Sequence, residues 1–220
     1  MNTLAIRLRL ALPKDSPAIV AAMHDAFRDS LFHQRCFPPS DPSSHDSLVG
    51  WVDKNLADPE SHMIIAEQGA PSPGTEADAA APHPIAGFAR WVRRPAPAPA
   101  PDSAPPPRMV FTADMYPAGG DAALAARVFQ ANYDALMRAT EGRSAWFLSM
   151  LVVPREHQRR GVGSALLGYG LERADRDAWA AYVNASAEGK PLYDKFGFAT
   201  VERSEFGDIV EYHMLREPRR

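Results

Sequence analysis

The sequence has little cysteine and no long apolar run. Its 220 residues include one cysteine, Cys36, which can form no intrachain disulfide and has no second cysteine for a metal-binding pair. We therefore expect no metal site and a reducing compartment, the cytoplasm or the nucleus. No stretch approaches the roughly 20 apolar residues of a membrane span, and Arg7 and Arg9 interrupt the apolar start of the chain. Neither a membrane span nor a signal peptide is predicted.

An excess of charge of one sign is also lacking. A formal net charge of −3 and a pI near 6.2 offer no electrostatic basis for binding nucleic acid or a membrane surface, so neither is expected as a partner. With 45% hydrophobic residues the chain can bury a sizeable core. We expect one soluble domain over residues 1–220, as a monomer or a homodimer.

Proline, in contrast, is plentiful. Many of the 21 prolines fall in two Pro/Ala-rich segments, at about residues 68–84 and 94–108. Such composition cannot pack a core. We interpret the segments as insertions within the domain, because the strands predicted before them need partners that come after them. A ligand for a proline-recognising partner is the alternative.

Hydrophobic periodicity predicts an alternation of strands and helices. The predicted strands cover residues 4–12, 63–66, 85–92, 146–153 and 180–185, with a closing hairpin at 198–203 and 209–215. The predicted helices cover residues 16–30, a segment from Ser43 or Ser44 to about Leu56, and residues 121–140, 161–177 and 191–196. This order predicts an α/β fold with a mixed sheet flanked by helices.

Residues 151–165 carry the clearest chemistry. An apolar strand is followed by a polar turn, and Gly161 and Gly163 open a helix. The first amides of a helix have no partner within it, and together with the helix dipole they form an anion site. Arg159 and Arg160 add positive charge, which favours phosphate or pyrophosphate. Glycines needed only for packing are the alternative.

The glycine spacing argues against two other phosphate-binding motifs. The sequence has no Gly-x-x-x-x-Gly-Lys-Ser/Thr, so a P-loop nucleotide hydrolase is not expected. The spacing also differs from the Gly-x-Gly-x-x-Gly of a dinucleotide-binding unit.

The same residues resemble a known family. Gln158-Arg159-Arg160-Gly161-Val162-Gly163, after the strand Leu151-Val152-Val153-Pro154, resembles the acetyl-CoA motif Gln/Arg-x-x-Gly-x-Gly/Ala of the GNAT superfamily of N-acetyltransferases. Tyr193, followed by Gly197-Phe198, resembles that family's second hallmark. The order of the two hallmarks makes the resemblance more specific than either one alone.

The resemblance extends into the N-terminal half. Asp25-Ala26-Phe27, Phe37-Pro38 and residues 85–91 look similar to fungal GNAT-domain proteins. The similarity covers nearly the whole chain and is strongest over residues 149–198, whereas the Pro-rich segments have no counterpart. It implies a GNAT-like, mostly antiparallel sheet flanked by helices.

The resemblance also implies an activity. It indicates an acetyl-CoA-dependent N-acetyltransferase that passes the acetyl group directly to a primary amine of a small molecule, or of a protein, without a covalent enzyme intermediate. Main-chain groups of the strand would pair with the pantetheine arm, one amide would polarise the thioester carbonyl, and amides of the turn would hold the pyrophosphate. The implied acetyl-CoA-binding residues are Leu151, Val152, Val153, Gln158, Arg159, Arg160, Gly161, Val162, Gly163, Ser164, Asn184 and Ser186.

Tyr193 is the expected general acid, which protonates the departing thiolate. A tyrosine that packs on the cofactor without proton transfer is the alternative. No general base is visible, since Ser149 and Met150 occupy the strand where many members have a glutamate. The missing base leaves open a catalytically silent CoA-binding sensor or scaffold.

Aromatic residues offer a candidate acceptor pocket, although aromatic side chains at helical spacing are more typical of a core, and we favour the core. The residues concerned are Phe27, Phe32, Phe37, Trp51 and Trp91.

Overall fold

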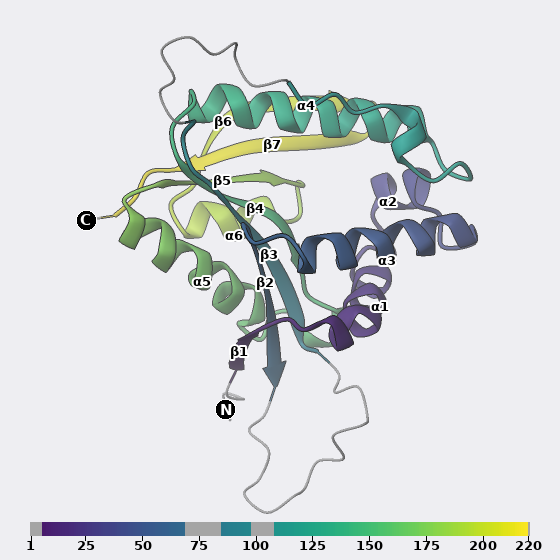
Figure 1. Cartoon of the computed structure of the whole chain (residues 1–220), viewed down its shortest axis with the longest axis horizontal. Helices are drawn as coiled ribbons and strands as arrows, with labels where there is room; N and C mark the ends of the chain where they lie inside the picture. Colours follow the sequence, from purple (N-terminus) through teal and green to yellow (C-terminus); the bar gives the residue numbers. More distant parts are fainter. Residues whose placement is uncertain (1–5, 69–84, 98–107, 220) are drawn as a thin grey trace, which may run out of the picture.

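The computed structural model describes residues 6–68, 85–97 and 108–219, and its strands form one seven-stranded sheet in the order β1-β2-β3-β4-β5-β7-β6 (Figure 1). The strands are β1 Ile6–Leu10, β2 Ser61–Gln68, β3 Gly87–Arg94, β4 Ala145–Val152, β5 Ala180–Ala185, β6 Ala199–Phe206 and β7 Ile209–Arg216. The helices are α1 Ser16–Ala26, α2 Leu31–Cys36, α3 Pro42–Leu56, α4 Ala122–Thr140, α5 Val162–Asp177 and α6 Lys190–Lys195. No helix in the described ranges is long and apolar enough to cross a membrane.

Every predicted strand is confirmed, as are the helices corresponding to α1, α3, α4, α5 and α6. Helix α2 was not predicted, because its 6 residues are too few to show a helical apolar period. The prediction of Ser43 or Ser44 as the cap of α3 is wrong: the Asp41 carboxylate accepts from the Ser43 amide. The predicted insertions fall largely on residues 69–84 and 98–107, which lie outside the described residues.

The sheet is mostly antiparallel, as predicted, with one parallel pair, β4 and β5. Helix α5 covers one face, whereas α1, α3 and α4 cover the other (Figure 1). Neighbouring residues of β2 show this division, because Ile64 belongs to the apolar cluster beneath α5 and Ile65 to the cluster beneath α1 and α3. Under α5, Gly170 lets the Trp91 ring lie directly against the helix.

The central strands β4 and β5 separate part-way along their length. Their pairing runs from Ala145↔Ala180 to Leu148↔Val183 and stops there within the described residues. At that point β4 has a β-bulge: Met150 pairs with Arg90 and Leu148 with Trp91, so that Ser149 is the extra residue. A bulge bends the strand that contains it. Beyond Ser149, β4 therefore pairs with β3 only, and a gap between β4 and β5 opens toward the start of α5.

Candidate functional site

The start of α5 presents backbone amides that have no acceptor. Gly161 precedes the helix with a φ of 87° and has no side chain to cap it. The first amide to find a partner is that of Ala165, which donates to the Gly161 carbonyl at 3.0 Å. Within the described residues, the amides of Val162, Gly163 and Ser164 therefore remain available to an anion.

The two glycines are required for different reasons. The positive φ of Gly161 is a conformation that L-residues rarely adopt. At Gly163 a Cβ would meet Leu192 at 3.4 Å, an ordinary contact, so packing within the chain does not require glycine there. The absent side chain at Gly163 instead keeps the helix end accessible, which favours the anion site over the packing alternative.

The turn before α5 is anchored at one end and positively charged at the other. The Arg155 amide donates to Asp25 Oδ2 of α1 at 2.8 Å, and Gln158 Nε2 donates to the Val153 carbonyl at 3.0 Å. Arg159 and Arg160 are exposed, and neither forms an ion pair with any residue that the structure describes. Their charge adds to that of the helix dipole at the same place.

Only alternate residues at the end of β4 direct their main-chain groups into the gap. A Cβ on Gly87 of β3 would lie only 2.6 Å from the Val152 carbonyl oxygen, so the main chain of Val152 faces β3. Successive residues of a strand direct their main-chain groups to opposite sides. The main-chain groups of Leu151 and Val153 therefore face the gap. Of the three residues predicted to pair with the pantetheine arm, only these two could do so.

Tyr193 of α6 is buried, with 7% of its surface exposed. Its ring packs edge-to-face with that of Phe198, with 5.8 Å between the ring centroids. Its hydroxyl makes no hydrogen bond to any group in the described part of the chain. Burial raises its pKa, and the negative charge of Glu211 raises it further. At neutral pH the hydroxyl therefore keeps its proton and can donate it.

The two polar residues at the end of β5, Asn184 within the strand and Ser186 just after it, already have partners in the chain. Ser186 Oγ accepts from the Gly189 amide at 3.3 Å, in the turn that leads into α6. Asn184 Oδ1 accepts from the Tyr182 hydroxyl at 2.9 Å and lies 2.8 Å from His213 Nδ1. A role for either residue in holding acetyl-CoA stays a prediction.

Sequence reasoning missed Glu211 of β7. Its side chain is half-buried, and burial raises its pKa to about 7. A hydrogen bond from Asn132 lowers the pKa, whereas the negative charge of Glu188 raises it. In the sequence it is one polar residue in an alternating strand, and nothing there marks it as buried. At the position where a glutamate was sought, Ser149 accepts instead from Arg90 Nη1 at 2.9 Å.

The aromatic residues considered for an acceptor pocket belong to the core. Phe37 and Trp91 are buried, whereas Phe27, Phe32 and Trp51 are partly buried against the cluster beneath α1 and α3. Trp91 lies on the other face, where its indole NH donates to the Leu166 carbonyl at 3.3 Å. The core interpretation is therefore confirmed.

A model of the acetyltransferase (GNAT) domain matches residues 127–215, from within α4 to within β7. The chain is also similar to three solved structures. The first is "histone acetyltransferase HPA2 and related acetyltransferase" from Corynebacterium glutamicum, with 21% identity, 99% of this chain and 98% of that chain covered, and a TM-score of 0.59. The second is a GNAT-family acetyltransferase from Desulfovibrio desulfuricans, with 15% identity, 97% and 99% coverage, and a TM-score of 0.54.

The third is the PaiA N-acetyltransferase of Thermoplasma acidophilum in complex with coenzyme A, with 9% identity, 97% and 99% coverage, and a TM-score of 0.53. At these identities the three structures establish the fold of the chain. None of the three organisms is a fungus, so the resemblance to fungal members stays a prediction.

Proposed function

We propose that the protein transfers the acetyl group of acetyl-CoA directly to a primary amine of a small molecule, because residues 127–215 match a model of the acetyltransferase (GNAT) domain. A protein amine is the second acceptor class. A silent CoA-binding sensor is the competing function, and the carboxylate of Glu211, whose charge raises the pKa of Tyr193, argues against it.

One observation carries the proposal: the gap where β4 leaves β5 opens beside the unpartnered amides of α5. An extended arm lying in the gap would find the main-chain groups of Leu151 and Val153, and its pyrophosphate would reach Val162 to Ser164. Arg159 and Arg160 would complement the phosphate charge. The donors therefore suit both the anionic and the amide parts of CoA.

Acetyl-CoA would supply an electrophilic thioester carbonyl. The Leu151 amide, which faces the gap, would donate to the carbonyl oxygen as its negative charge develops. Tyr193 would give its proton to the sulfur that leaves.

Direct transfer agrees with the position of the single cysteine. Cys36 is fully buried in the cluster beneath α1 and α3. Burial raises the pKa of its thiol to about 11, and the charge of Asp121 adds to this. A thiol that keeps its proton is a poor nucleophile, so an acetyl-cysteine intermediate is not expected.

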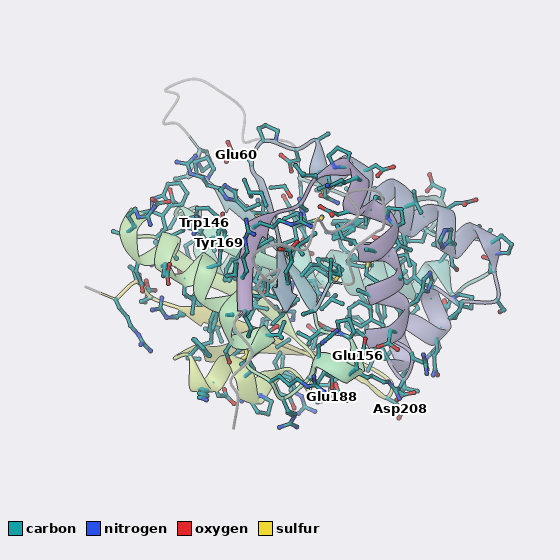
Figure 2. The ribbon with its side chains drawn as sticks, turned by 90° about the horizontal axis from the view of Figure 1, so that it is seen from below. Glu60, Trp146, Glu156, Tyr169, Glu188 and Asp208 are labelled. Atoms are coloured by element: carbon teal, nitrogen blue, oxygen red, sulfur yellow. The ribbon has the colours of Figure 1, made fainter. Side chains whose placement is uncertain are left out.

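The charge around the site suits a protonated amine. Glu156, Glu188 and Asp208 belong to three separate segments and are labelled in the lower part of the view in Figure 2. We propose that these carboxylates raise the local concentration of a cationic substrate at the site.

Release of free thiol from acetyl-CoA, followed with polyamines, aminoglycosides, amino acids and peptides, tests the proposal. We expect amine-dependent thiol release together with an acetylated product of the corresponding mass. Tight binding of CoA without thiol release for any amine would favour the sensor instead.

A further inference from the structure

We propose that Glu211 is the proton acceptor that converts the bound ammonium into the attacking amine, an inference that rests on the proposed acetyl transfer. It assigns the general base that sequence patterns do not reveal.

Glu211 lies in β7, a strand that contacts α4 (Figure 1). His213, two residues along β7, has its ring against the Tyr182 hydroxyl and Asn184. Alternate residues of a strand share a face, so Glu211 points the same way. There Asn132 of α4 hydrogen-bonds to it. The β5–β7 pairing ends at Ala185↔Tyr212, so Glu211 lies next to the end of β5, where the gap opens. Tyr193 belongs to the cluster on the α5 face, so the acid and the base lie on opposite faces of the sheet.

No cation in the described ranges neutralises the carboxylate of Glu211. Glu202 and Glu205 of the same hairpin pair with Arg138 and Arg203, at 2.6 and 2.8 Å. Glu211 forms no ion pair with any described residue. A half-buried carboxylate held by one neutral amide is destabilised in its charged form, and a cationic ammonium is its natural complement.

The proton balance is as follows. Glu211 takes one proton from the ammonium, which frees the nitrogen lone pair to bond to the acetyl carbon. The C–S electron pair leaves with sulfur, and Tyr193 protonates the sulfur. The second proton lost by the nitrogen returns through solvent to Tyr193, and Glu211 releases its proton to solvent. One proton is therefore released in each turnover.

The titratable groups around Glu211 are Glu188 before α6, Tyr193 of α6, Tyr182 of β5 and His213 of β7. Burial first, and then Glu188, raises the pKa of Glu211 to about 7, close to the value at which a general base is most effective at neutral pH.

The test compares wild type with Glu211→Gln, using whichever amine of the panel releases thiol fastest. At pH 7 the variant should lose about 10²- to 10⁴-fold in kcat/KM. Wild-type kcat/KM should level off above pH 7, whereas that of the variant should keep rising toward the amine pKa, because free amine must then come from solution.

Two further measurements separate catalysis from structure. Calorimetric binding of CoA by Glu211→Gln should match wild type within a few-fold. In the unliganded protein, a ¹³C-carboxyl NMR titration should show one glutamate signal titrating near pH 7 that Glu211→Gln removes. Glu205→Gln, the same change on an exposed residue of β6, is the matched control and should keep wild-type rates.

The outcomes are distinguishable. If the wild type is active and Glu211→Gln has the same rate and pH profile, the assignment of Glu211 is overturned but the proposed function is not. A wild type that releases no thiol with any amine would overturn the proposed function, and the role of Glu211 with it.

Discussion

At the residue scale, the proposed mechanism depends on two side chains whose protonation states are set by burial. Tyr193 keeps its proton because a phenolate would be costly in its apolar surroundings, and Glu211 holds a proton more readily than an exposed glutamate for the same reason. The same desolvation thus prepares one residue to donate and the other to accept.

Tyr193→Phe tests the donor. The ring still packs against Phe198, but the proton is gone, so we expect kcat to fall by about 10² to 10⁴. CoA affinity by calorimetry should stay within a few-fold of wild type. Tyr169→Phe is the control: it removes an α5 hydroxyl that lies 3.2 Å from Nδ1 of His62 in β2, and it should keep wild-type activity. Turnover retained within a few-fold in Tyr193→Phe would show that the tyrosine only packs.

At the element scale, α5 combines two functions along its length. Its buried residues Val162, Leu166 and Leu167 fill the core beneath it. Its first turn leaves three amides open at the edge of the sheet. The proposed anion site and a core helix therefore share one element.

Gly163→Asp separates these two functions. A Cβ at this position makes only ordinary contacts, and a carboxylate there interacts favourably with the helix dipole, so the free energy of unfolding should stay the same or rise by up to about 1 kcal/mol. It also places negative charge where the pyrophosphate would lie, so CoA should bind at least about 10-fold more weakly, or roughly 1.4 kcal/mol. Urea denaturation and calorimetry measure the two effects.

Gly168→Asp is the matched control, since Gly168 lies farther along α5 with open space around it. CoA affinity that falls equally in both variants would argue against an anion site at the start of the helix.

At the scale of the whole molecule, the end of the chain is tied to α5. Arg216 of β7 is 4% exposed and donates to both carboxylate oxygens of Asp175 at 2.7 and 2.9 Å, and the Arg219 amide donates to the same carboxylate at 2.7 Å. This cluster joins the last strand to the helix that carries the anion site.

Asp175→Asn should destabilise the fold by about 3 kcal/mol, because it leaves a buried guanidinium unpaired. The hydrogen bond from Arg216 lowers the pKa of Asp175, so its contribution is complete above the unfolded value of about 3.9 and is lost as the pH falls through the lower folded value. Urea denaturation between pH 2 and 7 should therefore show a smaller acid-induced loss in the variant. Asp194→Asn, in an exposed helical pair with Lys190, should change stability by less than about 0.5 kcal/mol.

The sequence by itself determined the elements and the anion-binding turn, because both are local. Apolar periodicity depends on neighbouring residues, and Gly161, Gly163 and the arginines lie within one turn of each other. The Asp41 cap was not predicted because Ser43 and Ser44, a few residues away, are equally suitable cap residues. Helix α2 was not predicted because it is too short to show an apolar period.

Only the tertiary structure decided what surrounds that turn. Whether Leu151 or Val152 faces the gap depends on the register with β3, and the gap itself depends on where β5 stops pairing with β4. The pKa of Glu211 is raised only because folding buries its side chain and brings the charge of Glu188 near it. Burial and proximity are properties of packed elements, and a chain read residue by residue does not contain them.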